Sequence, residues 1–278
     1  MKRLVSLGPL AVVLIACSDE PADEAREGAG EALLSYVALG DSFAAMGARD
    51  QPLRGEPFCL RSTGNYPELI HTEVTDVTCQ GAVSADLLQA RDTPEGQLSA
   101  QMDALDGATT LVTLSIGGND LGFGDVAGCI SNRMRQPGQA DCVEIWGADI
   151  NQRLARVPAE LDRVHEQISE RSKDAQVVVT GYLPLVSAGD CPELAVVSEA
   201  DRAWAINLTA DINRVVQEAA HRHGADFVLP GSAEDHTVCA APDDRWADIR
   251  GVETDAYPLH LTSAGHGAMA EAVQEVLE

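Results

Sequence analysis

Short apolar segments alternate with longer amphipathic segments along this chain, and the alternation predicts an α/β domain. Five segments are predicted to be strands, because they are short, mostly apolar and rich in β-branched residues, as in a parallel sheet that is covered on both faces. These segments are residues 36–39, 74–79, 110–116, 176–180 and 226–229.

Helical periodicity fills the intervals between the strands. Apolar residues recur every three or four positions over residues 150–168 and again over residues 204–219, which places them on one face of a helix. Pro158 interrupts the first pattern, so we expect either a kinked helix or two helices there.

The C-terminal segment completes the pattern. Thr262 or Ser263 can cap a last helix that runs through Val276. The sequence shows no internal repeat and no second domain. We therefore predict an α/β fold, a flavodoxin-like three-layer α/β/α sandwich with a parallel central sheet.

The N-terminal segment has the form of an export signal. Lys2 and Arg3 precede an apolar segment over residues 4–16, which is too short to span a bilayer as a stable helix. It ends in Leu14-Ile15-Ala16-Cys17, which resembles the cleavage box of bacterial lipoproteins. In such signals the cysteine receives a lipid and becomes the new N-terminus. An ordinary signal peptide with an incidental cysteine is the alternative.

This resemblance divides the chain into three parts. We expect a lipoprotein signal peptide over residues 1–16 and a disordered tether over residues 17–31, which are rich in Asp, Glu, Ala and Gly. The folded domain then covers residues 32–278. The expected location is outside the cytoplasm, anchored to a bacterial membrane at the cell envelope or surface by a lipid on Cys17.

The cysteine count agrees with export. Six cysteines remain after Cys17, at positions 59, 79, 129, 142, 191 and 239, and an even number in an exported protein suggests three disulfides. Fifteen pairings are possible, of which the sequential one is the simplest. A metal site is the alternative, but no Cys-x-x-Cys pair supports it, so we expect no metal.

Composition excludes some classes of partner. The formal net charge of −25 disfavours nucleic acid. Aromatic residues make up only 4% of the chain, which disfavours a long aromatic platform for sugars. The acidity favours solubility and names no substrate.

Three segments carry candidate chemistry. Ser42 lies in Leu39-Gly40-Asp41-Ser42-Phe43, directly after the first predicted strand, which places its hydroxyl at the carboxyl edge of the sheet. Gly117-Gly118-Asn119-Asp120 follows another predicted strand, and His260 lies near the C-terminus. A serine, an amide donor and a histidine are the components of a serine hydrolase.

These segments resemble a known family. Gly40-Asp41-Ser42, Gly81, Gly117-Gly118-Asn119-Asp120 and His260 match, in order and spacing, the blocks of the SGNH (GDSL-type) hydrolases. Further segments resemble the secreted actinobacterial lipase and esterase branch of that family: residues 116–123 followed by Cys129, Gly181-Tyr182, and residues 204–207 and 236–239. The resemblance covers the chain from about Leu33 to its end.

The resemblance implies an activity and a set of residue roles. The chain would be a carboxylic ester hydrolase that needs no cofactor, with Ser42 as the nucleophile and His260 as the base. The main-chain N–H groups of Ser42 and Gly81 and the side chain of Asn119 would form the oxyanion hole. Taken alone, Gly81 could be a turn residue and Asn119 a helix cap. The branch also implies the sequential bridges Cys59–Cys79, Cys129–Cys142 and Cys191–Cys239.

The last block departs from the family pattern. The family usually has Asp three residues before the histidine, and this chain has Tyr257 there. We expect the main-chain carbonyl of Tyr257 to orient His260, with the side chain of Asp255 as the alternative.

The remaining histidines receive non-catalytic interpretations. We interpret His266 as a surface residue of the last helix and His236 as structural. Four others are expected at solvated helix positions: His71, His165, His221 and His223.

The expected partner is an ester substrate, either a lipid or a small acyl ester, and the expected assembly is a monomer. Phospholipase or acyltransferase activity on the same site is an alternative. A binding lipoprotein without catalysis is disfavoured, because it would not need Ser42, Asn119 and His260 together. The sequence does not indicate the acyl-chain length.

Overall fold

Five parallel strands form the central sheet of the computed structural model, in the order β2-β1-β5-β6-β7. They are β1 (Tyr36–Gly40), β2 (Thr75–Asp76), β5 (Leu111–Ser115), β6 (Gln176–Thr180) and β7 (Asp226–Val228). Counted within the sheet, this is the 2-1-3-4-5 order of flavodoxin-like folds, so the predicted fold class is confirmed.

The structure describes residues 34–136, 138 and 140–278. The expected signal peptide (1–16), the lipidation site Cys17 and the expected tether (17–31) lie outside the described residues. No helix in the described part of the chain is long and apolar enough to cross a membrane.

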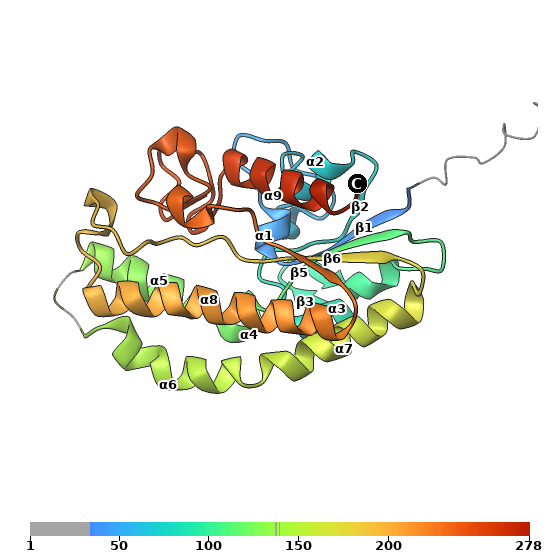
Figure 1. Ribbon diagram of the computed structural model, residues 1–278, viewed down its shortest axis with the longest axis horizontal. Helices are drawn as coiled ribbons and strands as arrows, with labels where there is room; N and C mark the ends of the chain where they lie inside the picture. The colour runs from blue at the N-terminus through green and yellow to red at the C-terminus, as the bar shows by residue number, and fades with distance from the viewer. Residues whose placement is uncertain (1–33, 137, 139) are drawn as a thin grey trace, which may run out of the picture. The chain divides into compact units, whose positions relative to one another are not determined.

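Helices cover both faces of the sheet, which gives the three layers (Figure 1). One face carries α2 (Tyr66–Ile70) and α9 (Ser263–Glu275), with the short α1 (Ser42–Ala45) beside them. The opposite face carries the larger group of helices: α3 (Ser84–Leu88), α4 (Gly118–Leu121), α5 (Phe123–Arg135), α6 (Cys142–Leu154), α7 (Val157–Arg171) and α8 (Glu199–Arg222).

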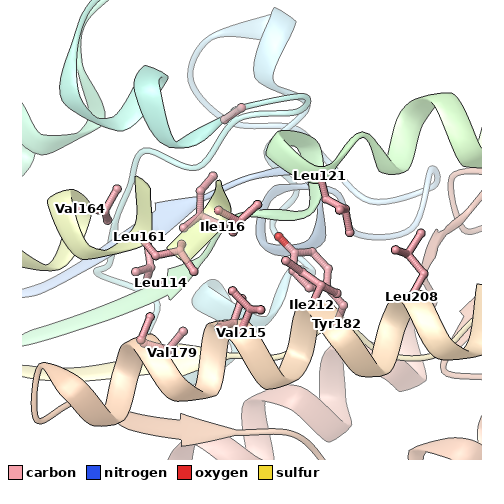
Figure 2. Close-up of a cluster of buried hydrophobic side chains, with 14 of the residues drawn as sticks. Leu114, Ile116, Leu121, Leu161, Val164, Val179, Tyr182, Leu208, Ile212 and Val215 are labelled. Carbon is pink, nitrogen blue, oxygen red and sulfur yellow. The ribbon is translucent and has the colours of Figure 1, made fainter. Parts of the chain in front are cut away.

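Each face of the sheet has its own hydrophobic core, because side chains alternate along a strand. Tyr36 and Ala38 of β1 pack toward α2 and α9, whereas Val37 and Leu39 pack toward the opposite layer. Figure 2 shows the larger core, in which sheet residues meet α4, α7 and α8. Its labelled members are Leu114, Ile116, Leu121, Leu161, Val164, Val179, Tyr182, Leu208, Ile212 and Val215.

The helix predictions are confirmed. Pro158 divides the 150–168 pattern, since α6 ends at Leu154 and α7 starts at Val157 with the proline in its first turn, where a missing N–H costs nothing. The 204–219 pattern lies within α8. Thr262 is the N-cap of α9, and its hydroxyl accepts from Gly265 N at 3.1 Å.

The second predicted strand is shorter than expected. Only Thr75–Asp76 is regular, yet the chain continues along β1 through Val77 N–H to Ala38 O (3.1 Å) and Cys79 N–H to Gly40 O (3.0 Å). This extension carries the chain to the carboxyl edge of the sheet, where the candidate residues lie.

Two small hairpins lie outside the predicted pattern. Strands β3 (Arg91–Thr93) and β4 (Gly96–Leu98) pair with each other, as do β8 (Ala247–Asp248) and β9 (His260–Leu261). The amino edge of the sheet is simpler: a short turn joins α7 to β6, and in it an exposed ion pair joins Lys173 to Asp174.

The six cysteines of the domain form three disulfides in sequential order: Cys59–Cys79, Cys129–Cys142 and Cys191–Cys239. The second bridge joins α5 to α6, and the first joins the segment before α2 to the chain that follows β2.

Candidate active site

Ser42 begins α1 at the carboxyl end of β1, at the edge where the sequence predicts it. Asp41 caps this helix by accepting from Phe43 N–H at 2.9 Å. Gly40 has φ +149°, and a Cβ there would lie 2.5 Å from Ser115 O, so only glycine fits between β1 and β5. The buried side chain of Gln101 bonds both Gly40 N (2.7 Å) and Gly40 O (2.9 Å), which fixes the turn before the serine.

His260 opens β9 and faces the same cavity as Ser42. Its Nδ1 lies 2.8 Å from Pro258 O. A carbonyl only accepts, so Nδ1 carries the proton and Nε2 of the neutral ring is left as an acceptor. The ring centroid lies 5.7 Å from that of Phe43, the residue after Ser42.

The sequence prediction for the residue that orients His260 is wrong. Tyr257 O accepts from the main-chain N–H of His260 at 3.1 Å, so it closes the turn and does not bond the ring. Leu259 has φ +68°, and the reversed chain direction there brings Pro258 O to the imidazole. The alternative also fails, because the side chain of Asp255 is 68% exposed and pairs with Arg49 at 3.9 Å.

Gly81 and Asn119 line the same cavity as Ser42 and His260. Gly81 has φ +65°, a conformation that glycine adopts easily. Asn119 donates from Nδ2 to Ala82 O at 2.9 Å, which ties α4 to the chain segment that contains Gly81. An amide nitrogen has two hydrogens, so Asn119 keeps one donor for a ligand. The structure thus brings together the four separate sequence blocks.

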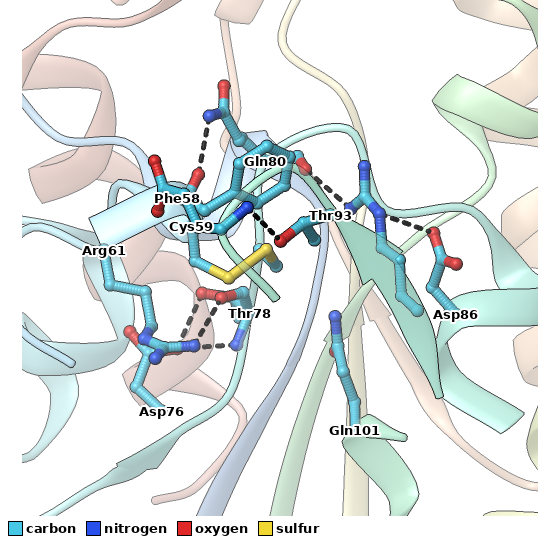
Figure 3. The surroundings of a disulfide bond; sticks show 12 residues. Phe58, Cys59, Arg61, Asp76, Thr78, Gln80, Asp86, Thr93 and Gln101 are labelled. Carbon is cyan, nitrogen blue, oxygen red and sulfur yellow. Dashed lines mark hydrogen bonds and ion pairs between the residues drawn. A yellow bond between two sulfur atoms is a disulfide. The ribbon is translucent and has the colours of Figure 1, made fainter. Parts of the chain in front are cut away.

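The segment that contains Gly81 is held from several sides (Figure 3). The Cys59–Cys79 disulfide anchors it two residues before Gly81, and Arg91 donates to Gln80 O at 2.9 Å. After Gly81, both carboxylate oxygens of Asp120 accept from Ser84 N–H at 3.0 Å. The Gly81 N–H is therefore fixed relative to α4.

Burial changes the acidity of the groups in this region. Burial raises the pKa of Asp41 to about 7, against the opposing hydrogen bond from Tyr182. Burial and the neighbouring Glu160 raise the pKa of Asp120 to about 6, against the opposing N–H of Ser84. Burial also lowers the pKa of His260 below its usual 6.5, so the ring is held neutral at neutral pH.

The cavity beside Ser42 has a volume of about 400 Å³, and side chains of α5, α8 and the chain after β6 form most of its wall. Most of these are apolar, including Phe123, Val126, Ile130, Leu185, Val186 and Leu208. The cavity can hold an apolar group next to the serine. A group of three or more metal-ligating side chains does not occur among the described residues.

Two histidine predictions are wrong. His266 is buried between α9 and α2, where Nδ1 accepts from Tyr66 N–H at 3.1 Å and Nε2 donates to Met46 O at 2.8 Å. His165 is also buried, on α7. The sequence contained a signal for both. His266 continues the apolar face of Met269 and Val273. His165 lies four residues after Leu161 and three before Ile168, on the same helix face. His236 stacks on Trp246 and bonds Asp244 O, which agrees with a structural role.

Sequence reasoning also missed three supporting residues. The main-chain carbonyl of Pro258 bonds the His260 ring. The side chains of Gln101 and Tyr182 bond Gly40 and Asp41, the two residues before Ser42. Only Tyr182 had a signal, as part of the Gly181-Tyr182 segment.

Comparisons with known proteins agree with this geometry. The model of the GDSL-like lipase/acylhydrolase family matches residues 38–268. Lipase 2 of Streptomyces coelicolor is 31% identical over 261 residues, which cover 88% of this chain and 86% of the relative. The lipase of Streptomyces rimosus is 35% identical over 201 residues, which cover 69% of this chain and 68% of the relative.

Two solved structures are also similar. The extracellular lipase of Streptomyces rimosus has a TM-score of 0.68 at 28% identity, over 87% of this chain and 99% of that one. Phospholipase A1 of Streptomyces albidoflavus has a TM-score of 0.66 at 27% identity, over 87% of this chain and 98% of that one.

The fold and the relatives agree on the class of protein, which is a carboxylic ester hydrolase. Within this class, the chain belongs to the GDSL-like lipase/acylhydrolase family. The resemblance to the SGNH hydrolases and to their actinobacterial lipase branch is thereby confirmed.

Proposed function

We propose that this protein hydrolyses carboxylic esters through an acyl-enzyme on Ser42, with His260 as the general base. The observation that carries the proposal is that Ser42, Gly81, Asn119 and His260 line one cavity, although they lie far apart in the sequence. Nε2 of His260 takes the proton of the Ser42 hydroxyl while Oγ attacks the ester carbonyl. The same proton then passes to the leaving alcohol, and a water molecule repeats the sequence to release the acid.

Three donors would stabilise the tetrahedral oxyanion: the N–H groups of Ser42 and Gly81 and Nδ2 of Asn119. Two observations support this set. The disulfide and Arg91 hold the chain around Gly81, and the bond to Ala82 O holds the Asn119 amide in place. Donors that are fixed before charge develops need no reorganisation during the reaction.

A dyad replaces the usual triad in this proposal. The Pro258 carbonyl sets the tautomer and the direction of the His260 ring, which are the orienting roles of a third carboxylate. A carbonyl carries no full charge, so it stabilises the imidazolium less than a carboxylate does. Burial lowers the pKa of His260 by more than the bond to Pro258 O raises it.

The apolar cavity favours an ester with an apolar acyl group, as in a lipase or esterase. A phospholipid is the second candidate, because the solved structure of a phospholipase A1 is similar over 87% of this chain. An acyl acceptor other than water would use the same acyl-enzyme. Neither alternative changes the roles of Ser42 and His260.

We also propose that the protein is an exported, lipid-anchored monomer. Support comes from the sequence of residues 1–17, from the three disulfides and from the likeness to an extracellular lipase. Replacing Cys17 with Ala should move the protein from the membrane fraction to the soluble fraction or stall its processing. Equal membrane association of both forms would indicate a plain signal peptide.

The catalytic proposal is tested with Ser42→Ala, assayed on nitrophenyl esters of increasing chain length. The variant should keep its fold and lose nearly all turnover. Ser172→Ala is the matched control, because Ser172 is a buried serine at the opposite edge of the sheet. Undiminished hydrolysis by Ser42→Ala would end the proposal.

A further inference from the structure

We propose that Tyr182 is a positioning residue. It holds the turn that contains Asn119 in a fixed position relative to the turn that contains Ser42. The proposal rests on the proposed function, since it concerns how the oxyanion donors converge. Its basis is a continuous chain of hydrogen bonds between the residue before Ser42 and the residue before Asn119.

The chain of bonds passes through the phenol oxygen. Gly118 N–H donates to Tyr182 Oη at 2.7 Å, and the Tyr182 hydroxyl donates to Asp41 Oδ2 at 2.6 Å. The other oxygen of Asp41 accepts from Phe43 N–H, as described above. One side-chain atom therefore connects the first turns of α1 and α4.

Only a phenol satisfies both ends of this chain. A main-chain N–H can only donate, and the ionised form of Asp41, which the hydrogen bond from Tyr182 favours, can only accept. The connecting group must therefore accept once and donate once. Phenylalanine would do neither, and histidine has a different reach. Burial raises the pKa of Tyr182 well above its usual value, so the hydroxyl remains a donor at every working pH.

Tyr182 is itself fixed from a third element. Its N–H donates to Asn213 Oδ1 at 2.7 Å, and Asn213 Nδ2 donates to Tyr182 O at 2.9 Å, so α8 holds its main chain on both sides. The position of the hydroxyl is therefore set independently of the two turns that it connects. Figure 2 shows the Tyr182 ring within the core, beside Ile212 of α8.

The ring also fills the space between the turns. Its edges contact Phe43 and Phe123, with centroid distances of 4.9 Å and 5.2 Å. A Cβ on Gly118 would lie 2.9 Å from the ring, so the α4 turn rests directly on it. Phenylalanine would keep these contacts, so Tyr182→Phe removes the hydroxyl and little else.

The consequence concerns transition-state geometry. The Ser42 N–H and the Asn119 amide come from different strand ends and must converge on one oxygen. Displacements well below 1 Å weaken such donors. Loss of the hydroxyl leaves two buried groups unpaired and lets the two turns shift relative to each other.

The test compares kcat and KM for Tyr182→Phe on one ester. We expect kcat to fall about tenfold or more with KM nearly unchanged, which is less than the roughly 10²-fold loss expected when a donor is removed, as in Asn119→Ala. In the double variant the loss from Tyr182→Phe should largely disappear, because it acts through the Asn119 donor.

Tyr36→Phe is the matched control. Tyr36 is also buried, and its hydroxyl bonds Thr113 at 2.8 Å, on the sheet and away from both turns. This variant should lose stability with no change in kcat. If Tyr182→Phe does not fold, Asp41→Asn tests the chain of hydrogen bonds from its other end. The amide oxygen would still cap Phe43 N–H, which leaves the amide nitrogen facing the phenol. That nitrogen only donates, so the Tyr182 hydroxyl would lose its acceptor.

Either of two results would overturn the inference. The first is a wild-type kcat in Tyr182→Phe, or in Asp41→Asn if the former does not fold. The second is a double variant with Asn119→Ala in which the full loss from Tyr182→Phe is added to the loss from Asn119→Ala. In either case an inactive Ser42→Ala would leave the proposed function intact. Hydrolysis that persists in Ser42→Ala would instead refute the function itself.

Discussion

His260 combines two features that set the pH range of the enzyme: a half-buried ring and an uncharged partner. The general base must be neutral, so activity rises with pH as His260 loses its proton. Burial lowers the pKa of His260 below 6.5. We therefore expect kcat/KM to reach half of its plateau below pH 6.5. A pH profile on an uncharged ester checks this, and a midpoint above 6.5 would contradict it.

The exposed carboxylate of Asp255 gives a second prediction. Asp255→Asn should keep kcat within about twofold, because Pro258 O already accepts from His260. A true triad carboxylate is worth about 10⁴-fold in the type case of the serine proteases. A loss of several hundredfold with an intact fold would restore a triad, and Asp50→Asn, another exposed loop carboxylate, serves as the control.

At this scale the sequence predicts the residues whose side chains act. Ser42, Asn119 and His260 have distinctive types at distinctive positions. The orienting carbonyl has no such signal, because every residue has one. The choice between Tyr257 and Pro258 depends on backbone angles such as φ +68° at Leu259, and these result from how the loop folds against the rest of the domain.

Among the elements, α5 gives the most direct control over substrate length. Gly128 lines the cavity, and a Cβ there meets nothing within 4 Å. Gly128→Leu should therefore fill part of the cavity without moving the helix. Turnover of long-chain nitrophenyl esters should fall relative to that of the acetate.

The control is Gly267→Leu, since Gly267 also has open space and lies on α9, away from the cavity lining. Comparable long-chain preference in Gly128→Leu and the wild type would place the acyl group elsewhere.

Elements were predicted correctly where an apolar pattern repeats over many residues, and they were missed where the element is only two or three residues long. Helices α6, α7 and α8 have several turns of apolar residues on one face. Strands β3 and β9 are too short and too polar to show alternation, and β2 loses its regular form after Asp76, whose carboxylate bonds Thr78. Such segments are set by tertiary contacts, which the local sequence does not contain.

For the whole molecule, buried histidines predict a dependence of stability on acid. Burial lowers the pKa of both His165 and His266 to about 4. Their folded pKa lies below the unfolded value near 6.5, so the unfolded chain binds protons first. The stabilisation is fully present above pH 6.5 and is lost as the pH falls through about 4. The melting temperature should fall over this range.

A comparison of His165→Gln with the wild type separates the effect of His165 protonation on stability from the effect of the net charge, which changes with pH in both proteins. The variant and the wild type should differ less at pH 4.5 than at pH 7, because only the wild type loses stabilisation by protonation there. A difference that is constant with pH would contradict the assignment. Asp41 affects stability in the opposite direction. Its pKa of about 7 in the folded protein lies above its ordinary value of 3.8, so its contribution to the free energy of unfolding is fully present below pH 3.8 and is lost as the pH rises through 7.

The parallel sheet has a practical consequence. All strands end at the catalytic edge, so the turn with Lys173 lies at the edge opposite Ser42. Lys173 is the only lysine after Lys2 in the sequence, and its side chain is 80% exposed. A solid support that reacts with side-chain amines would therefore attach the folded domain at one point and in one orientation, with the mouth of the cavity facing the solvent.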